Sequence, residues 1–71
     1  MKRVPVDSSA VRTVGYDDQS SVLEIVFTDG ACYEYRSVPR QHFETMTDGS
    51  TSVGRYLARK IKGHYRYRQI R

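Results

Sequence analysis

The sequence has one cysteine, no tryptophan and no long hydrophobic run. A single cysteine, Cys32, cannot form an internal disulfide, which excludes the disulfide-stabilised class of small secreted domains. No apolar stretch approaches the roughly 20 residues that span a bilayer. No apolar run follows Met1-Lys2-Arg3 as it would in a signal peptide. We therefore expect a cytoplasmic protein with no membrane contact.

Groups that bind metals or catalyse reactions are also scarce. Cys32, His42 and His64 lack the spacing of metal ligands, and the five glycines form no phosphate-binding loop. Neither histidine has an evident acid–base partner, and a cysteine on a strand is typical of core packing. We therefore expect no metal, no cofactor and no enzymatic activity.

Acidic residues are absent from residues 52–71, which carry seven of the 12 lysines and arginines. The residues before them carry all eight acids and only five bases, so the net charge of +4 arises from the C-terminal segment. Such an uneven distribution produces a positive local field, which favours an anionic partner. The alternative interpretation is a basic surface that serves only solubility.

Aromatic residues, in contrast, are plentiful. Six tyrosines and two phenylalanines in 71 residues are too many for a disordered segment. The length allows one domain, residues 1–71. Residues that favour β-structure predict three strands, over 9–16, 22–27 and 31–36.

Two features mark the N-terminal part of the chain. Residues 1–8 are expected to be a lead-in, because Pro5 argues against a central strand. In the first strand, Val11 and Val14 can face the same side only if the strand contains a bulge, which we place at Gly15.

The second and third strands form a hairpin whose register can be deduced. A loop of Thr28-Asp29-Gly30, with Gly30 in the left-handed conformation, pairs Ile25 with Tyr33. One face of the hairpin is then apolar or aromatic throughout: Leu23, Ile25, Phe27, Tyr33 and Tyr35. The same register places Glu24 opposite Glu34, a pair that needs a base such as Arg12 between its members.

Helical periodicity follows the strands. A first helix begins at Ser37-Val38-Pro39, with Pro39 in its first turn, and buries Phe43 and Met46. A second helix over 53–62 begins after the capping residue Ser52 and ends at Gly63. Its apolar stripe consists of Val53, Tyr56, Leu57 and Ile61. With residues 64–71 as a short strand or an ordered tail, the prediction is an α+β fold: a three-stranded antiparallel β-meander with two α-helices packed on one face.

Candidate functional residues concentrate in the basic C-terminal segment. Arg55, Arg59 and Lys62 stand at positions i, i+4 and i+7, which predicts one basic helix face with no acid near it. Bases and an aromatic residue then alternate: Arg66, Tyr67 and Arg68. Guanidinium groups bind phosphates and tyrosine rings stack on unpaired bases, a combination that favours single-stranded or structured RNA. For the other tyrosines we favour core packing.

A set of motif residues is distributed along most of the chain, from about Val6 to Ile70. They are Ser8-Ser9-x-Val11, Val14-Gly15-Tyr16-Asp17, Leu23, Phe27, Gly30, Tyr33-x-Tyr35, Val38-Pro39, Phe43, Ser52-x-Gly54-x-Tyr56, Ile61 and Tyr65. In this order they resemble the KTSC domain, a small module named for the C-terminus of some lysyl-tRNA synthetases that also stands alone in bacteria and phages. The loop from Thr47 to Thr51 departs from the family by being longer. The resemblance implies RNA binding only through the company of a tRNA-charging enzyme.

Two functional hypotheses follow. The leading one is a non-catalytic RNA-binding module that contacts phosphates through Arg55, Arg59, Lys62, Arg66 and Arg68 and stacks a base on Tyr67. The alternative is a protein-interaction module that docks on an acidic partner or a phage or bacterial assembly, for instance by strand pairing at an exposed sheet edge. Hydrolase or nuclease activity is disfavoured, because the carboxylates lie elsewhere in the sequence.

Overall fold

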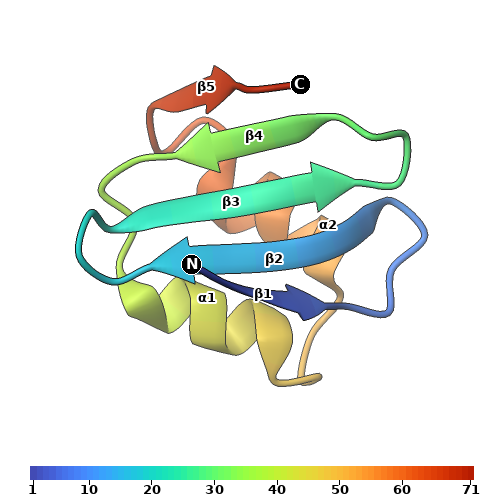
Figure 1. Ribbon diagram of the computed structural model, residues 1–71. Helices are drawn as coiled ribbons and strands as arrows, with labels where there is room; N and C mark the ends of the chain where they lie inside the picture. Colours follow the sequence, from blue (N-terminus) through green and yellow to red (C-terminus); the bar gives the residue numbers. More distant parts are fainter.

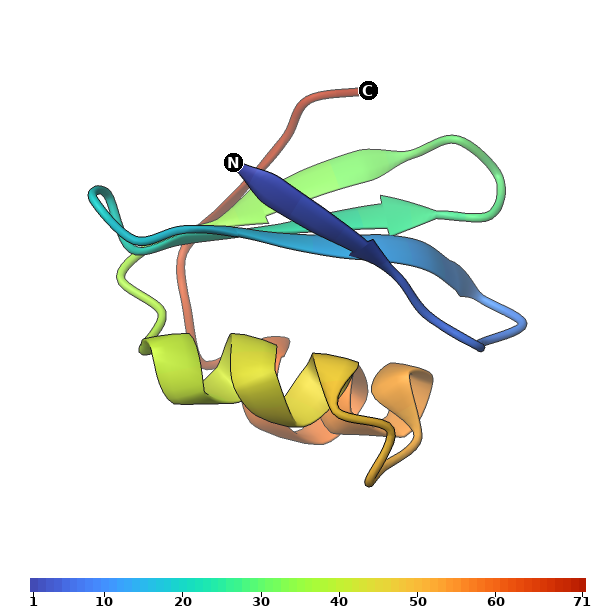
Figure 2. The same cartoon turned by 60° about the horizontal axis from the view of Figure 1, so that its bottom comes forward.

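A five-stranded antiparallel sheet forms one layer of the computed structural model, which describes residues 1–71 (Figure 1). The strands follow one another in the sheet in chain order: β1 (Lys2–Pro5), β2 (Val11–Asp17), β3 (Val22–Phe27), β4 (Cys32–Tyr35) and β5 (Tyr67–Gln69). The helical segments all lie on one face of this sheet (Figure 2). The α+β class and the one-sided helices are thus confirmed, whereas the expected number of three strands is too low.

The two additional strands form the edges of the sheet. Residues 1–8 are not merely a lead-in, since β1 pairs with β2 and Pro5 stands opposite Thr13. An edge strand tolerates proline, which lacks an N–H, because an outward-facing backbone nitrogen there has no ladder hydrogen bond to lose. At the other edge β5 pairs with β4, so that the C-terminal segment is a short strand as one of the two expectations had it.

The irregularity in β2 lies at a different residue from the one predicted. The register shifts between Val11 and Thr13, whereas Gly15 pairs regularly with Glu24. Gly15 has another reason to lack a side chain: a Cβ atom there would lie 3.2 Å from the backbone carbonyl oxygen of Lys2 on the neighbouring strand. The shift at Arg12 allows both Val11 and Val14 to be buried.

The register of the β3–β4 hairpin is confirmed. Ile25 pairs with Tyr33, and Gly30 has a φ of +95°. The base beside Glu24 is not Arg12, whose guanidinium donates to the Thr28 carbonyl at 3.1 Å. It is Arg3 on β1, whose Nε lies 2.6 Å from the Glu24 carboxylate. This pairing raises the pKa of Arg3 and places a counterion beside a carboxylate that is buried in the sheet.

The helical layer covers the apolar face of the sheet. Helix α1 (Arg40–Thr47) begins one residue after Pro39, and it buries Phe43 and Met46 as predicted. The second helix is divided into α2 (Val53–Tyr56) and a π-helical turn, η1 (Leu57–Ile61). Ser52 caps α2 by accepting a hydrogen bond from the Arg55 N–H at 3.4 Å. The core between the two layers comprises Val11, Val14, Tyr16, Leu23, Ile25, Tyr35, Val38, Phe43, Met46, Val53, Leu57 and Ile61.

Candidate functional site

The predicted basic stripe on the second helix is divided by the π-helical turn. The Lys62 N–H bonds to the Leu57 carbonyl five residues earlier, at 2.9 Å, and the backbone then becomes extended at Lys62. Arg55 and Arg59 therefore remain on the exposed side of the helix, while Lys62 leaves it. The expectation of one helix face with three bases is wrong, because an α-helical spacing does not apply across a π-helical turn.

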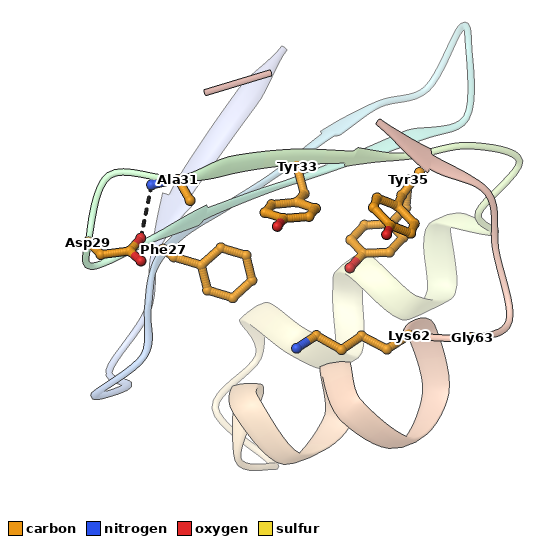
Figure 3. Close-up of a pocket in the computed structure, with 8 residues that line it drawn as sticks. Phe27, Asp29, Ala31, Tyr33, Tyr35, Lys62 and Gly63 are labelled. Atoms are coloured by element: carbon orange, nitrogen blue, oxygen red, sulfur yellow. Dashed lines mark hydrogen bonds between the residues drawn. The ribbon is translucent and has the colours of Figure 1, made fainter. Parts of the chain in front are cut away.

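Lys62 instead reaches a hollow of about 550 Å³ between the end of η1 and the sheet. Four aromatic rings line this aromatic hollow, with Lys62 and Asp29 among its polar residues: Phe27, Tyr33, Tyr35 and Tyr67. Figure 3 shows the rings of Phe27, Tyr33 and Tyr35 pointing from the sheet toward the helical layer, with the Lys62 side chain running beneath them. The Lys62 Nζ lies 5.9 Å from the centre of the Phe27 ring, at the outer limit of a cation–π contact.

Tyr67 is the exposed member of the aromatic hollow. It pairs with Tyr35 across the β4–β5 ladder, so both side chains lie on the helix-facing side of the sheet. Its ring centre lies 5.6 Å from that of Tyr33 and 5.7 Å from that of Tyr35, yet 62% of the residue is accessible to solvent. Burial, followed by the neighbouring Tyr33 and Tyr67, raises the pKa of Tyr35. Tyr67 thus presents an aromatic surface to solvent.

Arg66 and Arg68 occupy different places, because successive strand residues alternate between the faces of a sheet. Arg68 stands opposite Glu34, and its guanidinium lies 3.6 Å from that carboxylate. It therefore lies on the opposite face of the sheet from Tyr67 and is partly neutralised. Arg66 lines a second, more open hollow of about 520 Å³, which adjoins the aromatic hollow by sharing Gly63 and Tyr67.

The other bases of residues 52–71 form no ion pair; they are Arg55, Arg59, Lys60, Lys62, Arg66 and Arg71. Two arginines of the preceding segment do form ion pairs, whereas Lys2, Arg12 and Arg36 there do not. Arg3 pairs with Glu24, and Arg40 joins α1 to the β2–β3 turn by pairing with both Asp18 and Glu44. The predicted separation of charge along the sequence thus persists in the folded chain, with Arg68 as the exception.

A histidine bridge lies next to the site and was missed at the level of sequence. The Nδ1 atom of His42 lies 2.6 Å from the Tyr56 hydroxyl, and its Nε2 atom lies 3.1 Å from the Tyr65 hydroxyl. The bridge connects α1 to α2 and to the segment that leads into β5. No local pattern pairs a histidine with tyrosines 14 and 23 positions later, so only the fold reveals it.

The structure contains no group of three or more candidate metal ligands, and no helix is long and apolar enough to cross a membrane. Cys32 is buried, as predicted, and pairs with Val26 in the β3–β4 ladder. Its burial, followed by the charge of Glu24, raises the pKa of the thiol. The protonated form is a poor nucleophile, which agrees with a packing role.

The order of strands, the two helical segments and the Tyr33-x-Tyr35 pair can now be compared with known proteins. The family model of the KTSC domain matches residues 7–65. The chain belongs to the KTSC domain family. The matched segment holds most of the aromatic hollow, whereas Tyr67 lies beyond it.

Several known proteins share the sequence over most of this chain. An uncharacterized protein of Stutzerimonas stutzeri is 39% identical over 71 residues, which is 99% of both chains. A lysine–tRNA ligase of Nostoc sp. is 31% identical over 64 residues, which cover 90% of this chain but 11% of the ligase. The crystal structure of a KTSC domain protein from Yersinia pestis superposes with a TM-score of 0.87 at 35% identity, and covers 99% of this chain and 97% of that one.

Proposed function

We propose that this KTSC domain is a non-catalytic module that binds RNA through the basic C-terminal part of the chain. The observation that carries the proposal is the state of the seven lysine and arginine residues in 52–71: only one of them forms an ion pair. Lysine and arginine side chains without carboxylate partners are available to phosphates. When they neutralise phosphates, they release the salt ions that surround a nucleic acid.

The aromatic rings favour RNA over a polyanion that has no bases to stack on them. Lys62 and Tyr67 line the same hollow, and Arg66 lines the adjoining one. A single strand needs both elements, a positive groove for its backbone and rings on which its bases stack. Arg55 and Arg59 lie on the exposed side of the helix that leads into Lys62 and add two further positive charges to this segment. Arg68 is omitted from the proposed interface, because it lies on the other face of the sheet.

The lysine–tRNA ligases that share this domain add support by association, since their names indicate action on tRNA. Docking on an acidic protein is the second candidate, favoured by the exposed edge strand β5. A protein partner that is retained after nuclease treatment of a lysate would favour that candidate, whereas loss of all capture with nuclease supports RNA binding.

The direct test is a titration of the protein with tRNA and with a scrambled oligonucleotide of equal length, followed by fluorescence anisotropy over a series of salt concentrations. We expect the affinity to fall steeply with salt for both probes. Each phosphate contact with a single strand contributes a slope of about 0.7. Replacing Arg55 and Arg59 by alanine should therefore reduce the slope for the oligonucleotide by about 1.4.

A matched control removes two basic side chains from β1 and β2, at the opposite edge of the sheet from β5: Lys2→Ala with Arg12→Ala. Both residues are exposed and form no ion pair, so the net charge changes equally. The control should leave most of the slope intact. A response that is flat in salt, or a control that weakens binding as much as the helix variant, would refute RNA binding through this surface.

A further inference from the structure

The aromatic hollow has the volume of a small-ligand site. Its volume of about 550 Å³ falls within the range of ligand pockets, which is about 300–1,000 Å³. Four rings line it, and one of them, Tyr67, is largely exposed. The rings of Phe27 and Tyr33 project from the sheet toward the helical layer (Figure 3), and both residues are only half-buried.

The charge inside the hollow selects among aromatic-binding ligands. An aromatic cage without a resident cation suits a quaternary ammonium group. Here the Lys62 ammonium already lies over the Phe27 ring, so a second cation would be repelled. Rings together with a cation instead suit a flat ring that carries a phosphate, which is the chemistry of a nucleotide.

Asp29 provides a hydrogen-bonding contact at the rim. One of its oxygens, Oδ1, accepts the Ala31 N–H at 3.0 Å (Figure 3), and no hydrogen bond occupies the other. An ionised carboxylate only accepts hydrogen bonds. Guanine presents two adjacent donors on its Watson–Crick edge, N1–H and the N2 amine, whereas uracil presents one donor between two carbonyl oxygens that a carboxylate repels.

We propose that the aromatic hollow is a subsite for one unpaired guanine nucleotide. The base lies against the aromatic rings that line the hollow, the free oxygen of Asp29 accepts from its Watson–Crick edge, and Lys62 neutralises its phosphate. The proposal deepens RNA binding as proposed above and assigns it a base preference.

The test uses amide-shift titrations of the full chain with guanosine 5′-monophosphate and uridine 5′-monophosphate, and with guanosine as the ligand that lacks phosphate. We expect shifts around Tyr33, Tyr67 and Lys62, with the guanine nucleotide bound at least fivefold more tightly than the uracil nucleotide. Tyr67→Leu should weaken both by about tenfold, the usual cost of one lost base stack. Lys62→Gln should weaken the guanine nucleotide but leave guanosine unchanged.

Asp29→Asn tests the base preference. Asparagine retains the acceptor for the Ala31 N–H, so the turn persists, but its amide adds a donor. The preference for guanine over uracil should disappear. Asp48→Asn is the matched control, because Asp48 makes the same kind of turn, with Ser50 N–H at 2.8 Å, in the loop between α1 and α2. It should leave the preference unchanged.

The outcomes separate this proposal from RNA binding itself. Oligonucleotide binding with no shifts in the hollow, or equal affinities for the two nucleotides, overturns the guanine subsite and leaves RNA binding in place. Nucleotide binding in the hollow without any oligonucleotide binding supports the subsite and overturns the RNA interface. An acidic peptide that moves the same resonances more strongly than the guanine nucleotide overturns the subsite in favour of protein docking.

Discussion

The helix-facing side of the sheet is covered over β2 and β3 and open toward β4 and β5. In the covered region Val14 and Ile25 are fully buried beneath the helical layer. In the open region Tyr33 is half-buried, and Tyr67 is mostly exposed. Both regions carry large apolar or aromatic side chains, so hydrophobicity alone does not distinguish them. The difference arises because the second helix ends at Ile61, before it can cover the rings of Tyr33 and Tyr67, whereas Tyr35 is buried in the core.

The same division applies to charge. Near the covered region Arg3 and Arg40 have carboxylate partners, whereas Arg55, Arg59 and Lys62 have none. Paired charges and buried side chains stabilise the folded state. Exposed rings and lysine or arginine side chains without carboxylate partners can instead interact with a ligand. The comparison indicates that one region stabilises the domain, while the other carries rings and charges that the fold itself leaves unpaired.

The largest expected effect is a loss of stability from the covered region. Ile25→Ala removes a fully buried side chain and should lower the free energy of unfolding by about 2–5 kcal/mol. Tyr67→Ala removes a larger but exposed side chain, and should cost only about 1 kcal/mol through its ring contacts. Urea denaturation followed by circular dichroism measures both.

Ile25→Val extends this comparison to the case in which Ile25→Ala is unfolded without urea. It should cost about 0.5–1.5 kcal/mol, since it removes one methylene group. If Tyr67→Ala destabilised the domain as much as Ile25→Ala, the open region would be part of the stabilising core, and the division would be wrong.

A smaller effect concerns the hydroxyl groups that connect the layers. The Tyr16 hydroxyl donates to the Val38 carbonyl at 2.5 Å within the core. Tyr16→Phe leaves that carbonyl without its partner and should cost about 1–3 kcal/mol. Tyr65→Phe removes a half-buried hydroxyl from His42, at 3.1 Å, where solvent can replace it. We expect a smaller loss there, and equal losses in thermal denaturation would contradict the distinction between the regions.

Much of the covered region could be predicted from the sequence. The period-two pattern and the three-residue loop determined the β3–β4 register, and the spacing of Phe43 and Met46 identified the buried face of α1. Strand β1 was missed because a polar edge strand has no periodic signal, and its pairing depends on β2 being in place. The base beside Glu24 was also assigned incorrectly, since Arg3 reaches it only across that pairing.

The candidate site was less predictable: of the residues that line the hollow, only Lys62 and Tyr67 were named as functional candidates. The Tyr33-x-Tyr35 face followed from the register, and Tyr67 from its alternation with arginines. The π-helical turn did not follow, because its hydrogen bond from Lys62 to Leu57 depends on packing rather than on local propensity. Lys62 therefore moved from the helix face to the hollow, and the alternation of β5 placed Arg68 on the other face.

The smallest expected effect lies in the turn at the covered end of the sheet, where hydrogen bonds from Ser20 and the Gln19 N–H lower the pKa of Asp17. A carboxylate whose pKa is lower in the folded state stabilises the fold above its unfolded pKa of about 3.9, and this contribution is lost as the pH falls through the folded value. Asp17→Ala should therefore lower the urea midpoint at pH 7, and the difference from the unmodified protein should vanish in strong acid. Asp29→Ala, in the turn beside the open hollow, provides the comparison: its urea midpoint is measured against that of the unmodified protein at the same pH values. A difference for Asp17→Ala that is as large at pH 2 as at pH 7 would show that the turn depends on the side chain's shape rather than on its charge.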